Sequence, residues 1–200
     1  VHNFENDILV AARNIAKRYS TGKDHIKGTT DIALTIFDSM KKIHGMGARE
    51  RLLLQIAVQL HDCGKYISMA DVAECSYRII MATEIIGLYT EERKIIASAV
   101  RYNTTEFVYC GNYDRGPGID RQQYLLVAKL TAILRLANAM DRSHYQKVEA
   151  LRVVLKDREL QMLIDSSRDI SLELGLLRDK VQFFEEVFGI RLVLKRKRRV

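Results

Sequence analysis

Apolar residues recur at intervals of three and four positions along most of the first 140 residues, which is the period of an amphipathic α-helix. The stretches with this pattern are 4–19, 23–43, 48–60, 71–83, a segment that begins at Thr90, and 120–140. The last stretch is apolar around much of its circumference, which is typical of a helix at the centre of a bundle. The pattern therefore predicts a mainly α protein built on a helical bundle.

Polar and glycine residues mark two of the predicted helix ends. Asp120 and Gln123 have the spacing of a capping box, so we expect the longest helix to begin there. Gly64 follows the helix at 48–60, and we expect it to act as the C-terminal glycine of that helix.

The pattern changes after Val148. Residues 151–165 alternate like two short strands on either side of a turn at 156–159, and apolar residues on one face predict a helix at 172–188. Residues 190–194 then alternate weakly, as in a closing strand. We therefore expect a small β-β-α-β unit, an α+β appendage, and we place the domains at 1–146 and 147–200.

Composition limits the class of protein. Of the 200 residues, 48% are hydrophobic and 28% are charged, which is ordinary globular usage. The three cysteines show no CxxC spacing, which favours a reducing compartment such as the cytoplasm. No apolar run approaches the roughly 18–20 residues of a membrane span, so we expect no membrane partner.

The net charge of +7 is uneven, because residues 195–199 read Lys-Arg-Lys-Arg-Arg. Such an excess favours an anionic partner, for example a phosphate polymer or nucleic acid. The alternative is a solvated basic tail.

His61 and Asp62 are adjacent at the end of a predicted helix, where both side chains can turn toward one ion. Divalent ions take imidazole nitrogen and carboxylate oxygen from several elements. His25 begins one apolar stripe and Asp141 ends another, so both are candidates for the rim of the core. We therefore predict a metal site of His25, His61, Asp62 and Asp141. The alternative is a set of partly buried, hydrogen-bonded side chains without metal.

Three cations flank the predicted site. Lys65, Arg101 and Arg142 are candidates for contact with phosphate, and the alternative is that they are ordinary surface cations. No serine, histidine and aspartate arrangement marks a nucleophile, so the sequence identifies no catalytic residue.

His25, then His61-Asp62, then Asp141 at the end of a long helix resembles the pattern of HD-domain phosphohydrolases. Further pieces resemble the C-terminal HD-type domain of the Ppx/GppA family, the exopolyphosphatases and guanosine pentaphosphate phosphohydrolases. The stretches that carry this resemblance are 38–45, 61–64, 76–80, 100–102, 133–144 and 183–190. They span most of the chain, and the motif at 133–144 is the most specific.

The resemblance implies an HD-type helical bundle that binds polyphosphate and forms a homodimer. It also implies that hydrolysis of terminal phosphate takes place in N-terminal actin-like domains. We therefore expect this chain to be a C-terminal fragment, or a stand-alone relative, of an exopolyphosphatase, and not to be active alone. Two alternatives remain: an active metal-dependent HD phosphohydrolase acting on a nucleotide, and a non-catalytic module that binds a phosphorylated alarmone.

The sequence departs from the HD pattern in its histidines. Many HD domains have further histidines after the His-Asp pair, whereas here no histidine lies between His61 and His144, and Asn103 follows the Arg101-Tyr102 pair. A two-metal site needs such ligands. The sequence therefore favours at most one divalent ion, of manganese, magnesium, zinc or iron, or a metal-free site.

Overall fold

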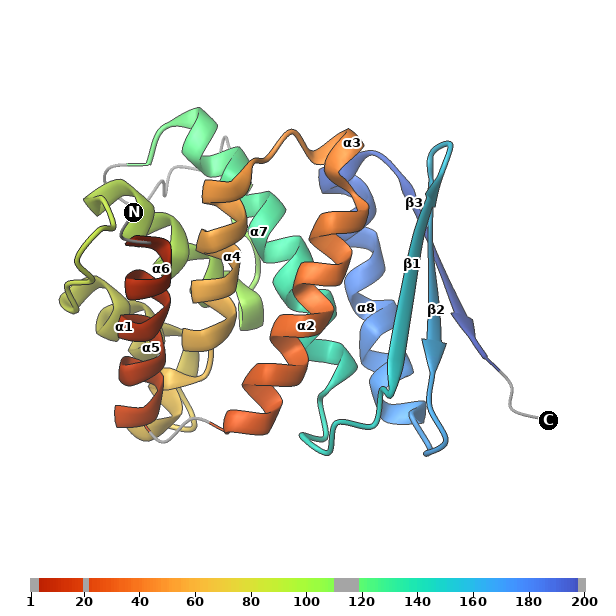
Figure 1. Ribbon diagram of the computed structural model, residues 1–200, viewed down its shortest axis with the longest axis horizontal. Helices are drawn as coiled ribbons and strands as arrows, with labels where there is room; N and C mark the ends of the chain where they lie inside the picture. The colour runs from red at the N-terminus through yellow and green to blue at the C-terminus, as the bar shows by residue number, and fades with distance from the viewer. Residues whose placement is uncertain (1–3, 20–21, 110–118, 198–200) are drawn as a thin grey trace. The chain divides into compact units, whose positions relative to one another are not determined.

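The computed structural model describes residues 4–19, 22–109 and 119–197. Within these ranges the chain is mainly helical with one small sheet, as the sequence predicts. The helices are α1 Phe4–Arg18, α2 Lys23–Ser39, α3 Lys41–His44, α4 Ala48–Leu60, the 3-10 helix η1 Cys63–Tyr66, α5 Val72–Ala82, α6 Thr90–Thr104, α7 Arg121–Met140 and α8 Ser171–Phe188. The strands are β1 Ala150–Lys156, β2 Glu159–Asp165 and β3 Arg191–Arg196 (Figure 1).

The chain divides into two compact units, which are described separately below. Unit 1 consists of residues 1–21 and 48–131, and unit 2 of residues 22–47 and 132–200. The domain boundary predicted near residue 146 lies inside unit 2, because α2 and the end of α7 belong to the same unit as the sheet. The functional division at residue 146 stays a prediction.

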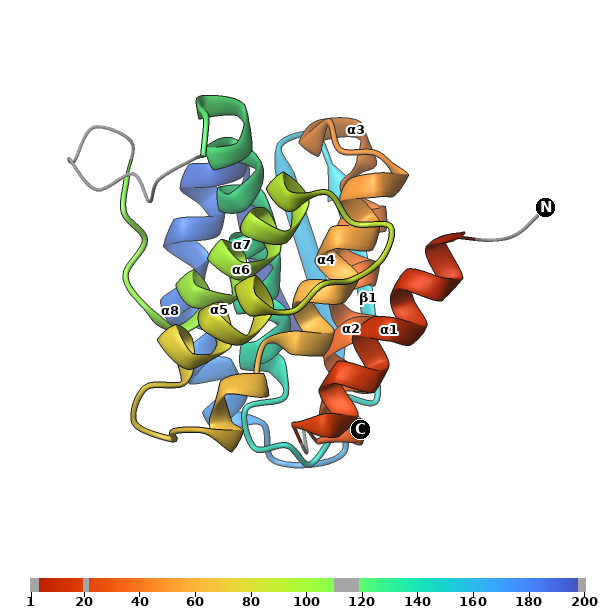
Figure 2. The ribbon, with the colours of Figure 1, turned by 90° about the vertical axis from the view of Figure 1, so that its left-hand side faces the viewer.

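In unit 1, α4 packs against α1 and α6, and α6 packs against α5 (Figure 2). Ile56 of α4 and Ile96 of α6 are fully buried. Arg49 of α4 donates two hydrogen bonds to Glu92 of α6, at 2.7 and 2.8 Å. Burial of Glu92 disfavours its charge, but Arg49 outweighs burial, so that the pKa of Glu92 is lowered. The ion pair thus fixes the start of α6 against α4.

Gly64 has a different role from the one that the sequence predicts. It lies in η1 and is not among the residues with positive φ. A Cβ at this position would lie 2.4 Å from the carbonyl oxygen of Val72 and 2.5 Å from the backbone nitrogen of Ser76. The backbone of η1 therefore approaches α5 closely, and the Gly64 N–H donates to Ser76 Oγ at 2.8 Å. Glycine is required here for space and not for a left-handed helix end.

In unit 2 the strand order is β1-β2-β3, with β1 antiparallel and β3 parallel to β2. The predicted turn between β1 and β2 is confirmed, with Asp157 at a φ of 56°. Helix α8 makes the crossover that a parallel neighbour of β2 requires. Leu160, Met162 and Ile164 alternate along β2 and are buried, as expected for a strand with one covered face.

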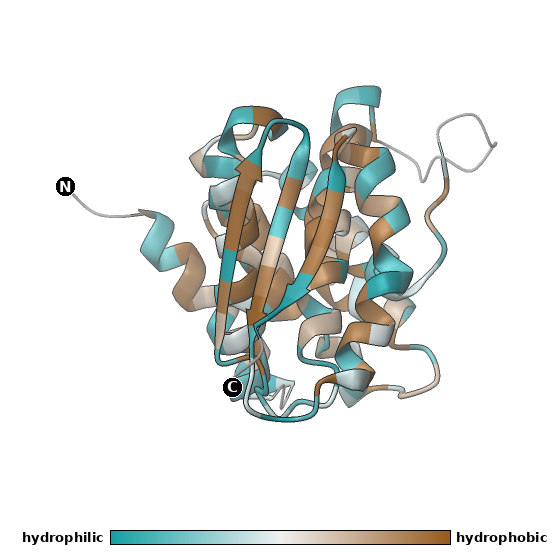
Figure 3. Cartoon of the chain, turned by 90° about the vertical axis from the view of Figure 1, so that its right-hand side faces the viewer, coloured by the Kyte–Doolittle hydropathy of each residue, from teal (hydrophilic) through white to brown (hydrophobic). Residues whose placement is uncertain are grey.

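Helices α2 and α8 lie on the same side of this sheet, where α2 contacts β1 and α8 contacts β3 (Figure 1). Seen from the other side, the strands show mixed apolar and polar residues, and no helix of unit 2 covers them (Figure 3). Arg152, Leu163 and Lys195 are register partners on this uncovered face.

The predicted helix ends are partly confirmed. Asp120 and Gln123 form the capping box, because the Gln123 N–H donates to Asp120 Oδ1 at 2.8 Å and the Asp120 N–H donates to Gln123 Oε1 at 3.1 Å. The single helix expected at 23–43 is wrong, because it is broken at Met40, whose side chain is fully buried. None of the helices that the structure describes has the length and apolar character needed to span a membrane.

The close approach at Gly64 predicts a large effect of substitution. Gly64→Ala is expected to lower the free energy of unfolding by about 3 kcal/mol, since a methyl group there overlaps backbone atoms that cannot move independently. Urea denaturation measures the change. Gly175→Ala in α8 is the matched control, because a Cβ there meets no atom within 4 Å, and it is expected to stabilise by about 0.5–1 kcal/mol. Equal effects of the two substitutions would contradict this account of Gly64.

Candidate functional site

Two of the predicted site residues, His25 and Asp141, meet inside unit 2. His25 lies in the first turn of α2 and Asp141 directly follows α7, yet His25 Nδ1 is 2.7 Å from Asp141 Oδ2. Both side chains are almost fully buried. A carboxylate only accepts hydrogen bonds, so His25 donates from Nδ1.

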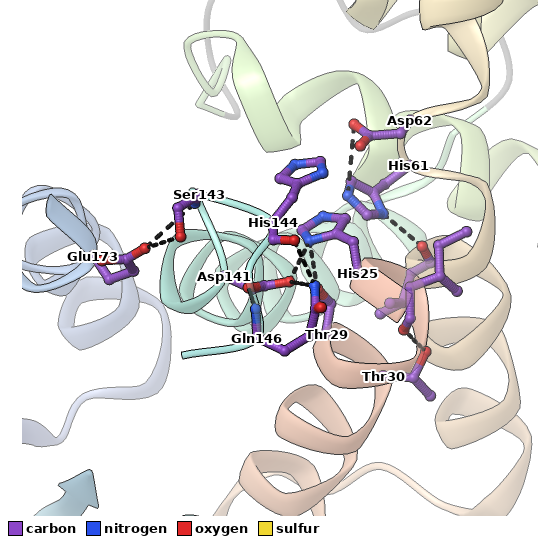
Figure 4. A network of polar contacts seen from close by, with 12 residues as sticks. His25, Thr29, Thr30, His61, Asp62, Asp141, Ser143, His144, Gln146 and Glu173 are labelled. Carbon is purple, nitrogen blue, oxygen red and sulfur yellow. Dashed lines mark hydrogen bonds and ion pairs between the residues drawn. The ribbon is translucent and has the colours of Figure 1, made fainter. Parts of the chain in front are cut away.

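Gln146 supplies the remaining donors to Asp141. Its backbone N–H donates to Oδ1 at 2.8 Å, and its side-chain amide donates to Oδ2 at 3.0 Å (Figure 4). Burial of Asp141 disfavours its charge, but the hydrogen bonds from His25 and Gln146 outweigh burial and lower its pKa. Asp141 is therefore held as a carboxylate whose first role in this structure is to orient His25.

The turn after Asp141 has an unusual backbone. His144 and Gln146 have φ values of 59° and 46°, which residues other than glycine rarely adopt. The His144 ring stacks on the His25 ring, with 3.6 Å between centroids and 4° between planes. The sequence does not identify His144 and Gln146 as site residues, because nothing in it marks these backbone angles.

Helix α8 holds the same turn from the other side. Glu173 accepts hydrogen bonds from the Ser143 hydroxyl at 2.5 Å and the Ser143 N–H at 3.3 Å (Figure 4). The Nζ atom of Lys147 lies 3.5 Å from Glu173 Oε1. Burial opposes the charge of Glu173, but Ser143 and Lys147 favour it and its pKa is lowered. The strained turn is thus fixed at both ends by buried carboxylates, Asp141 and Glu173.

His61 and Asp62 lie together in unit 1, at the end of α4. The buried His61 donates from Nδ1 to the Val58 carbonyl at 2.5 Å, so a neutral ring has its lone pair on Nε2. That Nε2 atom is 3.6 Å from Asp62 Oδ1 (Figure 4). Two ligands of a tetrahedral zinc ion are about 3.4 Å apart, so this pair has a spacing that suits two ligands of one ion.

A second feature of His61 also suits a metal ligand. Histidines that bind metal usually donate their other ring N–H to a carbonyl or carboxylate, which fixes the ring. The Val58 carbonyl does this for His61. Asp62 has a competing partner, because its Oδ2 accepts from Lys65 Nζ at 2.8 Å. That His25, His61, Asp62 and Asp141 bind one ion together stays a prediction.

The three predicted phosphate-binding cations have different surroundings. Lys65 forms the ion pair with Asp62 just described, and Arg101 forms an ion pair with Glu74 at 3.0 Å and lies 3.4 Å from the centroid of the Tyr77 ring. Arg142 is exposed in unit 2. Lys65 and Arg101 are therefore already neutralised by carboxylates, and an anion would have to compete with these.

Cys63 follows the His61-Asp62 pair but lacks the properties of a nucleophile. Burial, with a smaller contribution from the charge of Asp62, raises the pKa of the Cys63 thiol to about 11, although the hydrogen bond with Ser76 opposes the shift. A reactive cysteine needs a lowered pKa and an accessible sulfur. Cys63 is thus a buried core residue beside the site.

Residues 10–181 match the family model described as Ppx/GppA phosphatase, domain III. The match includes both the His61-Asp62 pair and the buried His25–Asp141 pair. None of the curated proteins matches the chain.

The raised pKa predicts that Cys63 resists alkylation in the folded protein. At about pH 8, about one Cys63 side chain in a thousand is a thiolate. We expect iodoacetamide to label the half-buried Cys75 faster than Cys63, as measured by peptide mass spectrometry. Urea should remove the difference by exposing both thiols. Faster labelling of Cys63 in the native protein would show that it is accessible and activated.

Proposed function

Because the chain belongs to the Ppx/GppA phosphatase domain III family, we propose that it binds polyphosphate for a phosphatase that releases the terminal phosphate. The family match over residues 10–181 carries this proposal. The net charge of +7 supports it, because an excess of cations attracts a polyanion of any sequence or length.

We propose that the bond-breaking step belongs to N-terminal actin-like domains of the same protein. The support is the resemblance to the C-terminal part of that family. We further propose that the protein is a cytoplasmic homodimer. The family resemblance implies a dimer, and the cysteine usage favours a reducing compartment.

We also propose that the site binds a single divalent ion, with His61 and Asp62 among its ligands. The hydrogen bond from His61 to Val58 and the 3.6 Å spacing of the two ligand atoms support this. Such an ion would attract phosphate oxygens. Lys65 would then give up its ion pair with Asp62 and contact the phosphate or water instead. Asp141, through its hydrogen bond, would keep the His25 ring in one orientation.

One alternative function keeps the same residues. A metal-dependent phosphohydrolase acting on a nucleotide would use the ion to activate water, and the preset ring of His61 favours this alternative. A second alternative is a regulatory module that binds a phosphorylated alarmone without hydrolysing it.

Polyphosphate binding should depend steeply on salt. For about three to five phosphate contacts, raising potassium chloride from about 50 to about 200 mM should weaken binding roughly 40- to 500-fold, by analogy with DNA. Fluorescence anisotropy with labelled polyphosphate measures this on the purified chain. Binding that is absent, or insensitive to salt, would contradict the polymer role. Tighter binding of a guanosine tetraphosphate than of the polymer would favour the alarmone module.

Metal binding should depend on Asp62. At a manganese concentration about 100 times the dissociation constant, we expect about 2.7 kcal/mol of added stability, measured by thermal unfolding. Asp62→Asn should remove most of this increment. Asp38→Asn is the control, because it removes the same charge from an exposed carboxylate on α2, which forms an ion pair with Lys41 at 3.6 Å.

The metal hypothesis fails if manganese, zinc, magnesium and iron all leave the melting temperature of the unsubstituted chain unchanged. An assay of phosphate release from a nucleotide in the presence of manganese distinguishes the binding role from the metal-dependent phosphohydrolase. Release that is lost in Asp62→Asn would establish the phosphohydrolase and overturn the binding role.

A further inference from the structure

One face of the sheet in unit 2 is not covered by any of the helices that the structure describes in that unit (Figure 3). Side chains alternate along a strand, and Leu160, Met162 and Ile164 of β2 are buried on the covered face, so their neighbours lie on the other one. The strand register then gives the residues of this uncovered surface, which we call the outer face: Ala150, Arg152, Val154 and Lys156 on β1, Glu159, Gln161, Leu163 and Asp165 on β2, and Arg191, Val193 and Lys195 on β3.

The outer face has four cations and two carboxylates, and the cations stand near its corners. Arg152 on β1 and Lys195 on β3 are both register partners of Leu163, so they lie opposite each other across β2. Lys156 and Arg191 likewise share one β2 partner, four positions away along each strand. Strands are about 4.8 Å apart and a residue advances about 3.3 Å, so the cations form two columns about 10 Å apart, each about 13 Å long.

The four cations are exposed, and none of them forms an ion pair with a carboxylate of the residues that the structure describes. Lys195 Nζ instead donates to the amide oxygen of Gln161 at 3.4 Å. Of the two carboxylates, Glu159 accepts from the Gln161 amide at 2.7 Å, and Asp165 forms an ion pair at 3.4 Å with Lys197, which follows β3. The charges of the two columns therefore face solvent without an internal counter-charge.

The arrangement of these charges indicates which partner fits. A second copy of the outer face would bring like charges together. Polyphosphate and single-stranded nucleic acids have one row of phosphates, whereas the cations form two columns on either side of β2. None of the outer-face residues is aromatic, so an unpaired base would find no ring on which to stack. A double helix has two rows of phosphates, one on each side of a groove, and keeps its bases paired.

We propose that the outer face binds duplex DNA through its phosphates, without recognising its sequence. The cations of β1 contact the phosphates of one strand, and those of β3 contact the other strand across the minor groove. That groove is about 6 Å wide in B-DNA, which suits columns about 10 Å apart, whereas the minor groove of an RNA duplex is wider. This inference goes beyond the proposed function, because it concerns another ligand and uses none of the residues of the predicted metal and phosphate sites.

The test is fluorescence anisotropy of a labelled DNA duplex of about 20 base pairs with the purified chain. We expect a dissociation constant in the micromolar range at about 50 mM potassium chloride. For about four phosphate contacts, the logarithm of the affinity should fall with the logarithm of the salt concentration with a slope of about −3.6. Arg152→Gln and Arg191→Gln should each weaken binding about three- to tenfold and bring the slope to about −2.7.

Two further variants separate this face from charge in general. Arg178→Gln is the matched control, because it removes the same charge from an exposed position on α8, the helix that contacts β3 from the covered side. It should change affinity less than about twofold. Arg152→Lys keeps the charge and should retain most of the affinity, since a phosphate accepts a point charge as well as a planar fork. Unchanged melting temperatures show that the variants are folded.

Several outcomes would overturn the proposal. These are no binding of the duplex at about 50 mM salt, equal losses in Arg152→Gln and Arg178→Gln, and equally tight binding of the single strand. Binding of anionic lipid vesicles, but not of DNA, that is lost in Arg152→Gln would assign the outer face to a membrane instead.

Polyphosphate as a second probe separates this inference from the proposed function. Duplex binding that depends on Arg152, in a chain that does not bind polyphosphate, would establish the outer face and contradict the polymer role. Arg152→Gln that weakens binding of polyphosphate and leaves binding of the duplex unchanged would assign the outer face to the polymer, and would overturn the DNA proposal while supporting the proposed function.

Discussion

The hydrogen bond between His25 and Asp141 is the interaction on which unit 2 depends. It joins the start of α2 to the end of α7 across 116 positions of sequence, and both side chains are almost fully buried. Placing a carboxylate there is unfavourable unless its oxygens accept hydrogen bonds, and removing one partner of such a pair typically costs about 3–5 kcal/mol. Gln146 supplies the other donors, but only from a backbone with positive φ. The unfavourable backbone conformation of Gln146 is therefore offset by the hydrogen bonds that it donates to the buried Asp141.

Helix α8 stabilises the turn after Asp141 in a similar way. Glu173, in its first turn, accepts from Ser143 and lies near Lys147, so the turn after Asp141 is held from two directions. Helix α8 also provides the crossover between the parallel strands β2 and β3. One helix thus connects the sheet to the buried histidine and aspartate. A side chain displaced in this turn would move His144, and with it the ring stacked on His25.

The ion pairs show which of the partly buried cations are neutralised by carboxylates. Arg49 and Lys147 stabilise their units through carboxylates, and Lys65 and Arg101 are neutralised in the same way. The total charge of the chain therefore does not show which cations could contact an anion, because these four are already paired.

Local features could be predicted from the sequence because they depend on residues a few positions apart. The helix at 48–60, the capping box of Asp120 and Gln123, and the β-β-α-β order each depend on spacing along the chain. The motif at 133–144 likewise identified the family that residues 10–181 match. The break at Met40 could not be predicted, because methionine has a high helix propensity, and only the structure shows its fully buried side chain at the end of α2.

Only the tertiary structure decided what these local features do. Gly64 suits a helix end by its position, but the backbone of α5 lies against it and makes it a contact residue. Asp141 suits a metal ligand by its type, which stays a prediction, and the structure shows that its carboxylate accepts hydrogen bonds from His25 and Gln146. The physical reason is the same in both cases. Periodicity and spacing act over one or two turns, whereas close contacts and buried hydrogen bonds depend on other segments, 12 residues away for Gly64 and Ser76 and 116 residues away for Asp141 and His25.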